Sequence, residues 1–207
     1  MISRFWIAAT LLAASGLAAR ANEGPTPLVE GDDPSQFELV AIGPDTIKIV
    51  DGEISISGHP DGYFATKKSY RNYRLTFDWR YERPEGLASD AQFRGNSGLL
   101  IHIARPHKVW PRCVEVQLMN ADAGHIFAIG GANFEGRKDA AAQRAAIKAV
   151  GEWNHEEVTC RDGAISCEIN GSLVDKGTGA MPDHGPIGWQ SEGWKIRFRN
   201  LLIRELD

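Results

Sequence analysis

The sequence predicts an all-β protein, a sandwich or barrel with one short helix, and three observations lead to this prediction. Short alternating or apolar runs recur after residue 36, and such runs are typical of strands with a buried face. Turn-forming pairs separate several runs: Asp51-Gly52, Asp61-Gly62, Asp162-Gly163 and Asn170-Gly171. One segment, 137–149, is rich in alanine and has no β-branched run, so we expect it to form the helix.

The expected strands are distributed along the whole chain after an N-terminal leader. They span residues 37–42, 46–50, 53–57, 62–66, 72–82, 97–104, 113–119, 125–129, 155–160, 164–169, 172–175, 186–190 and 194–206. Before them, residues 22–34 are polar and contain three prolines and two glycines, which predicts a flexible leader over 22–35. The sequence has no internal repeat, and we see no sign of a second domain in it, so we expect one domain over 36–207.

The first residues have the composition of a signal peptide. Arg4 provides a positive charge, and residues 5–19 form a nearly unbroken apolar run. Ala19-Arg20-Ala21 then places small residues at the two positions that a signal peptidase recognises. We therefore expect residues 1–21 to be removed, which gives a secreted or periplasmic protein; the alternative is an uncleaved N-terminal anchor.

The charge balance argues against two classes of partner. The chain has 23 Lys and Arg residues against 27 Asp and Glu residues, a net charge of −4 at pH 7, without a basic run. Such a chain has no electrostatic footprint for nucleic acid or for an anionic membrane. We therefore expect no nucleic acid partner and no membrane contact beyond the signal peptide.

The cysteines and acidic residues give no sign of a metal or another cofactor. Cys160 and Cys167 flank the Asp162-Gly163 turn, where they would lie diagonally across a hairpin; a strained disulfide and two buried thiols are both compatible with this spacing. Cys113 is the third cysteine, and no CxxC pair or Cys/His cluster is present. The sequence therefore predicts neither a metal site nor a cofactor.

Seven strings, in order, resemble one family. They are Asn96-Ser97-Gly98, Trp110-Pro111, Val114-Glu115-Val116-Gln117-Leu118, Gly151-Glu152-Trp153-Asn154, Ile169-Asn170-Gly171, Gly185-Pro186-Ile187-Gly188-Trp189-Gln190 and Phe198-Arg199-Asn200. This set, which covers roughly 36–207, resembles the 3-keto-disaccharide hydrolase family. The resemblance implies a concanavalin-A-like jelly-roll sandwich of two antiparallel sheets, and activity on glycosides whose sugar has been oxidised to a ketone at carbon 3.

Two positions depart from the family pattern. Glu192 stands where many members carry a histidine, and His125 stands where an acidic residue is common after a glycine. Both remain candidates, Glu192 for proton transfer and His125 for substrate contact. If either position performs acid–base work in the family, that work is exchanged or lost in this chain.

The strand at 113–119 is the most informative for chemistry. Val114, Val116 and Leu118 alternate with Glu115 and Gln117, so the polar pair shares one face, with the two residues about 6.6–6.8 Å apart. Sandwich glycosidases place carboxylates on such a face to bracket a sugar. An ordinary half-exposed strand gives the same pattern; the family strings favour the functional interpretation.

Several other side chains are candidates with a structural alternative. His102 titrates near neutrality inside an apolar strand, so it either transfers a proton or is held by a backbone carbonyl. Asn96 either forms a turn or presents its amide to a sugar. Trp110 and Trp194, next to turns, are the tryptophans best placed to stack on a sugar. Arg199 faces away from the core and either pairs with Glu115 or Glu192 or is solvated.

The implied chemistry assigns a role to each catalytic candidate. A ketone at carbon 3 acidifies the proton on carbon 2, whose removal expels the group at carbon 1, and water then adds. We expect Glu115 to be the base, Gln117 or His102 to hold the enolate, and Glu192 to be the acid if burial raises its pKa. The alternatives are an ordinary glycoside hydrolase that uses Glu115 and Glu192 on unoxidised glycans, and a non-catalytic carbohydrate-binding module.

The signal-peptide pattern makes a direct prediction about the mature protein. Because the recognised small residues end at Ala21, the exported chain should begin at Asn22. Intact-mass spectrometry of protein from the periplasm or the medium measures this start. A mature protein that retains Met1 would contradict the prediction.

Overall fold

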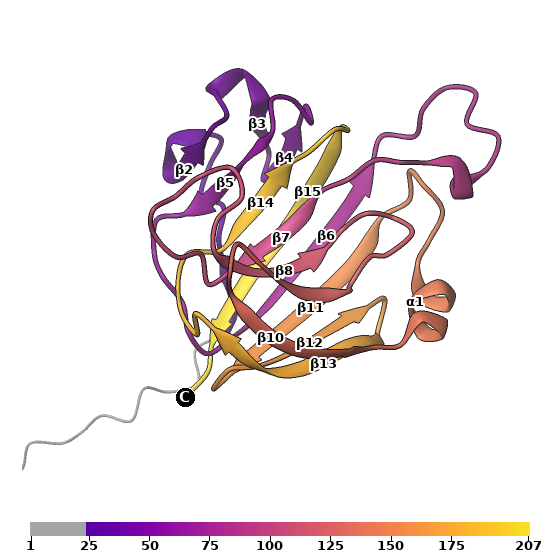
Figure 1. Cartoon of the computed structure of the whole chain (residues 1–207). Helices are drawn as coiled ribbons and strands as arrows, with labels where there is room; N and C mark the ends of the chain where they lie inside the picture. Colours follow the sequence, from indigo (N-terminus) through magenta and orange to yellow (C-terminus); the bar gives the residue numbers. More distant parts are fainter. Residues whose placement is uncertain (1–23) are drawn as a thin grey trace, which may run out of the picture.

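A computed structural model of the chain describes residues 24–207 and has two stacked antiparallel sheets (Figure 1). The expected signal peptide lies outside the described residues. Sheet A has nine strands, in the order β10 (Asn133–Lys138), β13 (Ser172–Met181), β12 (Ala164–Ile169), β11 (Asn154–Arg161), β6 (Tyr73–Tyr81), β15 (Ile196–Glu205), β4 (Glu53–Ile56) and β3 (Ile47–Val50), with β1 (Thr26–Pro27) beside β15. Sheet B has six: β2 (Phe37–Val40), β5 (Gly62–Thr66), β14 (Gly188–Ser191), β7 (Gly98–Ile101), β8 (Cys113–Gln117) and β9 (Ile126–Ile129).

This architecture confirms the predicted all-β jelly-roll sandwich. Every expected strand is present; β5 and β12 have the expected bounds, and β13 continues well past residue 175 to Met181. Strands β1 and β10 were not expected from the sequence. Three short 3-10 helices complete the described elements: η1 (Pro34–Gln36), η2 (Pro44–Thr46) and η3 (Asp90–Gln92).

The predicted helix is shorter than its alanine-rich segment. α1 spans Ala140–Ala146, because Arg137 and Lys138 pair with β13 as the end of β10. Asp139 then starts the helix, and its carboxylate accepts hydrogen bonds from the N–H groups of Ala141 and Ala142. No helix in the described part of the chain is both long and apolar enough to span a membrane.

Three of the four predicted turn pairs adopt the conformation that a two-residue hairpin needs. Asp51-Gly52, Asp162-Gly163 and Asn170-Gly171 all have positive φ at both residues, as type I′ turns require. The fourth pair is different, because Gly62 already belongs to β5. Local turn chemistry thus fixes the β3–β4, β11–β12 and β12–β13 connections.

Part of the expected leader belongs to the fold. Thr26 lies opposite Ile203 in β15, and the N–H of Leu28 donates to the carbonyl of Leu201 at 2.9 Å. Leu28 and Val29 pack against the core. The edge of β15 therefore anchors residues 26–29, a long-range pairing that the polar composition of this segment conceals.

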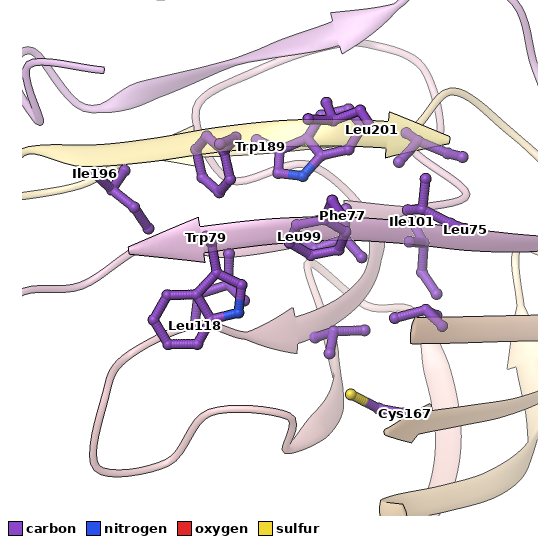
Figure 2. Close-up of a cluster of buried hydrophobic side chains, with 14 of the residues drawn as sticks. Leu75, Phe77, Trp79, Leu99, Ile101, Leu118, Cys167, Trp189, Ile196 and Leu201 are labelled. Atoms are coloured by element: carbon purple, nitrogen blue, oxygen red, sulfur yellow. The ribbon is translucent and has the colours of Figure 1, made fainter. Parts of the chain in front are cut away.

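The core lies between the two sheets (Figure 2). Trp189 of sheet B stacks on Phe64 with ring centroids 5.2 Å apart and meets the edge of Phe77 of sheet A at 6.1 Å. The three cysteines are free, buried thiols. Cys160 lies opposite Ile165 and Cys167 opposite Val158, the diagonal arrangement expected from their spacing.

One carboxyl group is buried in this core. Glu156 of β11 is fully buried, and its Oε2 accepts a hydrogen bond from Trp79 Nε1 at 2.8 Å, while Oε1 has no partner within the protein. Burial raises the pKa of Glu156 to about 8, and hydrogen bonds from Trp79 and Cys167 oppose this shift. The core thus accommodates Glu156 best as a neutral acid.

This carboxyl group should make the stability of the protein depend on pH. The folded protein favours the protonated form of Glu156, because its pKa there lies above the ordinary value of 4.5. The contribution of this group to the unfolding free energy is therefore complete below pH 4.5 and is lost as pH rises through 8. Glu156→Gln keeps an acceptor for Trp79 and cannot ionise. Between pH 5 and pH 8 the unfolding free energy of this variant should therefore decline by roughly 2–4 kcal/mol less than that of the unchanged protein.

Urea unfolding at several pH values measures this decline. Glu157→Gln, on the outer face of the same strand, is the matched control and should decline as the unchanged protein does. Parallel curves for the Glu156 variant and the unchanged protein would show that Glu156 does not titrate in this range.

Candidate active site

The outer face of sheet B carries a group of polar side chains. In β8, Glu115 and Gln117 point outward while Val114 and Val116 enter the core, as the alternation predicts. In β14 the same alternation buries Trp189 in the core and turns Gln190 outward. Leu99 of β7 lies opposite both Trp189 and Val116, so β7 runs between Gln190 and the polar pair of β8.

Gly98 is the floor between these side chains. A Cβ atom at this position would lie 2.3 Å from Gln190 Oε1 and 2.5 Å from Glu115 Oε1. Any side chain here would therefore collide with both groups. Because both oxygens lie so close to one point, they are at most about 5 Å apart above a bare stretch of backbone. The absence of a side chain at Gly98 is what lets the two polar groups lie together over the sheet.

Glu115 is held in an environment that favours its neutral form. The residue is only 5 % exposed. Burial, and secondarily the negative charge of Glu192, raises the pKa of Glu115 to about 8. Burial also raises the pKa of Glu192, although the side chain of Asn96 opposes that shift. Asn96 and Glu192 face each other across a backbone bridge, so two coupled carboxyl groups lie in one site.

Several buried polar atoms at this site lack a partner within the protein. They are both side-chain polar atoms of Gln190 and the Oδ1 atom of Asn96. Leaving such atoms unpaired costs free energy, and hydroxyl groups of a sugar can satisfy them. Gln117 is different, because its Oε1 already accepts hydrogen bonds from the N–H groups of Leu118 and Met119 at 2.9 and 2.8 Å. Only the Gln117 amide nitrogen is left for a ligand.

A loop over residues 102–112 closes one half of this face. Its Ile103 packs with Tyr63, Leu100 and Cys113, all fully buried on the outer side of sheet B. The loop reaches both sheet edges: His107 Nδ1 lies 2.7 Å from Glu38 Oε1 on β2, and Arg112 Nε donates to the carbonyl of Gly131, just after β9, at 3.0 Å. The half-buried residues Asn96 and Glu192 lie at the other end of the outer face of sheet B, which we call the open end.

That open end contains several of the expected sugar-contact residues. Asn96 and Glu192 are half-buried there. His125 lies beside Gln117, whose N–H donates to the His125 carbonyl at 2.9 Å, and the His125 ring contacts Asp122. Trp194, two residues after Glu192, is 38 % exposed; its indole N–H donates to the Glu82 carbonyl. Its ring meets the edge of Phe93 and lines a hollow with His59 and Arg83, so its contacts lie away from Glu115.

Trp110 is on the covering loop. It is 45 % exposed, the most of any tryptophan that the structure describes. It lies directly before the buried Pro111. Its ring is therefore available for stacking, on the loop that closes the other half of the face.

Two expected site residues lie elsewhere. His102 follows β7 in a left-handed conformation (φ 58°), and its ring packs on Tyr73 of sheet A with centroids 5.8 Å apart. Burial lowers the pKa of His102 to about 4. A neutral histidine between the sheets cannot hold a ligand beside Glu115. Neither ring nitrogen has a hydrogen-bond partner among residues 24–207, so the expected hydrogen bond with a backbone carbonyl is not formed either.

Arg199 is the second. It lies on the outer face of sheet A, where Nε donates to Asp78 Oδ2 at 3.2 Å and the guanidinium lies 4.0 Å from the centroid of the Trp153 ring. Pairing of Arg199 with Glu115 or Glu192 is therefore wrong, because the two carboxyl groups belong to the opposite sheet. Arg199 belongs to β15 of sheet A. The alternation of residues in the sequence could not reveal to which sheet this strand belongs.

Gln190 and Gly98 are the site residues that the sequence analysis did not select. Gln190 follows Trp189 in an apolar strand, the same alternation that singled out Glu115. This signal was available in the sequence. The position of Gln190 next to Glu115 was not, because it depends on β7 lying between β14 and β8.

Residues 24–204 match the family of 3-keto-alpha-glucoside-1,2-lyase-like domains. The chain belongs to this family. No significant match is found among curated proteins. Family membership makes the protein a carbohydrate-active enzyme, in agreement with the resemblance of the seven strings.

Solved structures share the fold of this lyase-like domain. A "putative glycosyl hydrolase" from Parabacteroides distasonis ATCC 8503 has a TM-score of 0.66 at 20 % identity and covers 89 % of this chain and 95 % of its own. The carbohydrate-binding module CBM66 from Bacillus subtilis has a TM-score of 0.57 at 11 % identity, covering 82 % and 96 %. The beta-glucanase of Bacillus licheniformis has a TM-score of 0.52 at 10 % identity, covering 89 % and 99 %. At these identities the likeness concerns the fold alone.

In the described residues of this lyase-like protein, no three His, Cys, Asp or Glu side chains are grouped so as to hold a metal ion. The titratable groups at the site are the carboxyl groups of Glu115 and Glu192, with Asp61 close enough to raise the pKa of Glu192 and with His125 at the edge.

The coupling of the two carboxyl groups can be measured directly. Glu115 should titrate with a midpoint near pH 8, and Glu192→Gln should lower that midpoint because it removes a nearby negative charge. A carbon-13 NMR titration of the glutamate carboxyl groups follows both. Glu53→Gln, on sheet A, is the control and should leave the Glu115 midpoint in place. A Glu115 midpoint near 4.5 would contradict the described environment.

Proposed function

We propose that this protein cleaves glycosides whose sugar carries a ketone at carbon 3, by proton abstraction at carbon 2, elimination and hydration. The observation that carries the proposal is the placement of the Glu115 carboxyl group and the Gln190 amide together above Gly98. Glycosides oxidised at carbon 3 are also the substrates that the family name implies.

Glu115 supplies the base. The ketone makes the proton on carbon 2 acidic, because the resulting negative charge spreads to the carbonyl oxygen. A carboxylate with a pKa of about 8 is a much stronger base than an ordinary one. The base must be ionised and the acid protonated, so turnover should have a bell-shaped dependence on pH.

Gln190 supplies the donor for the enolate oxygen. Its amide nitrogen is buried and has no partner within the protein, so it is free to donate to the developing negative charge. A pre-positioned donor in a water-poor site stabilises such a charge far better than water does. Gln190 takes the role that the sequence analysis gave to Gln117 or His102.

Glu192 supplies the acid. When Glu115 has taken the proton from carbon 2, the bond between carbon 1 and the glycosidic oxygen breaks and a double bond forms between carbons 1 and 2. Glu192 protonates the departing oxygen. Water then adds: its hydroxyl bonds to carbon 1, its remaining proton returns to Glu192, and Glu115 returns its proton to carbon 2. Burial favours the protonated form that the acid role needs. The reactive form has Glu115 ionised and Glu192 protonated, the reverse of the arrangement in which the Glu192 charge raises the pKa of Glu115.

The covering loop gives the sugar an orientation in this proposal. Glu192 and Asn96 lie at the open end of the face, and the loop over 102–112 fills the other. The leaving group at carbon 1 therefore points toward the open end, and carbon 3 points toward the loop. The expelled aglycone has a direct path to solvent.

Two other functions make different predictions for the same site. An ordinary glycoside hydrolase would use the coupled pair of Glu115 and Glu192 on unoxidised sugar, with direct displacement at carbon 1. A non-catalytic carbohydrate-binding module, a function known for one protein of this fold, would need neither ionisation. In neither alternative does the proton at carbon 2 exchange with solvent.

Glu115→Gln should lower turnover of a 3-keto-glucoside by about 10²–10⁴-fold, the usual contribution of a general base. Binding should change much less, because the amide still forms hydrogen bonds with the sugar. Steady-state kinetics and calorimetric titration with the same substrate separate these effects. In heavy water the unchanged enzyme should also incorporate deuterium at carbon 2 of a slow substrate, and the variant should not.

Glu53→Gln, far from the site on sheet A, controls for loss of a surface carboxylate and should retain full turnover. Full activity of Glu115→Gln would exclude Glu115 as the base. Equal turnover of unoxidised and 3-keto substrates would favour the ordinary hydrolase.

A further inference from the structure

The outer face of sheet A has a hollow of about 430 Å³. It lies over β10, β13, β12 and β11, on the sheet opposite Glu115. Thr159, Ala164 and Ser166 line it with small side chains, and Arg137, Lys176 and Arg161 are its charged residues. We call this place the basic hollow. We propose that it binds the acidic groups of an anionic glycan, a polysaccharide that carries carboxylates or sulfates.

The strand register places the cations of this face in one row. Arg137 lies opposite Lys176, Lys176 opposite Ser166, and Ser166 opposite Thr159. Thr159 in turn lies opposite Arg74, and Arg74 opposite Arg204. Six strands thus contribute a cross-strand row with four cations and no acid. At about 4.8 Å per strand, Lys176 and Arg74 are about 14 Å apart, which suits a polymer with repeated charges.

This row is unfavourable for the folded protein by itself. Like charges directly opposite each other in a sheet are destabilising, and the row contains two such pairs, Arg137–Lys176 and Arg74–Arg204. The adjacent row has Glu157 opposite Glu168. Acidic and basic side chains thus lie in separate rows, whereas opposite charges facing each other across the strands would stabilise the sheet. A bound polyanion would relieve the repulsion within the basic row.

The cations of the basic hollow are not neutralised by acidic side chains. Arg74 pairs with Glu157 at 3.3 Å. Among residues 24–207, neither Arg137 nor Lys176 is in an ion pair. Arg204 Nε, farther along the row, is buried without a partner. The exposed Arg137 and Lys176 therefore retain their capacity for an external anion, whereas the buried Arg204 Nε is out of its reach.

The chemistry of the hollow matches a glycan better than a nucleic acid. Guanidinium groups bind carboxylates and sulfates with paired hydrogen bonds, and the mainly apolar lining of the hollow can pack against a sugar ring. A nucleic acid duplex presents far more phosphates than this short row can neutralise, and the net charge of −4 repels it. The hollow is separate from the site of Glu115, so it would hold a polymer while the site acts on a sugar.

Calorimetric titration of the full protein tests the proposal with three probes: an oligogalacturonate, a sulfated heparin oligosaccharide and a neutral cello-oligosaccharide. At least one anionic probe should bind, with affinity that falls as salt rises, and the neutral one should not bind at the hollow. Arg137→Ala with Lys176→Ala should weaken that binding about tenfold or more, because charge-assisted hydrogen bonds are lost. Since it removes a repulsive pair, this double variant should fold, as a thermal unfolding curve verifies.

Lys48→Ala with Lys195→Ala removes the same total charge from sheet A away from the hollow and is the matched control. It should keep binding within about twofold, because long-range charge contributes little at physiological salt. Equal weakening by both double variants would overturn the proposal, as would equal affinity for the neutral probe or no binding of either anionic one. A DNA duplex bound more tightly than the glycans would also overturn it.

Discussion

The packing of Trp189 between the two sheets is the interaction on which the site depends. Its ring stacks on Phe64 and meets the edge of Phe77 from the opposite sheet. Because side chains alternate along a strand, burial of Trp189 forces Gln190 to the outer face. A slip of one residue in β14 would bury an amide in the core and expose the indole. The same argument holds for Val116 beside Glu115. The hydrophobic interface between the sheets therefore sets the direction of every polar group on the outer face.

The two buried glutamates show different uses of the same physical cost. Glu156 lies within the core, where one oxygen accepts a hydrogen bond from Trp79, and its raised pKa has no role in the proposed chemistry. Glu115 lies on the outer face of sheet B, beside a second carboxyl group. Desolvation raises both pKa values, but only Glu115 is near unpartnered amides that a ligand could bind. A shifted pKa alone thus does not identify a catalytic group; its neighbours do.

Prediction from sequence worked best where structure is local. The strands, three type I′ turns and the outward orientation of Glu115 and Gln117 all follow from alternation and turn residues. It failed where distant segments meet. β10 and β1 form because β13 and β15 offer edges to pair with, not because their own residues favour strands. The four cations of the cross-strand row come from four strands, so no basic run marks them in the sequence.

The sequence by itself determined the all-β class, the family and the pair of polar residues on β8, because alternation and ordered motifs are properties of the chain. Only the tertiary structure decided which partners Glu115 has. Strand order brings Gln190 next to Gly98 across more than ninety residues of chain. A left-handed residue after β7 turns His102 into the core, and membership of β15 in sheet A removes Arg199 from the site. The physical reason is that alternation along a strand fixes only the face on which a side chain lies. Its neighbours and its solvent exposure depend on pairing between distant strands, and those two properties set its pKa.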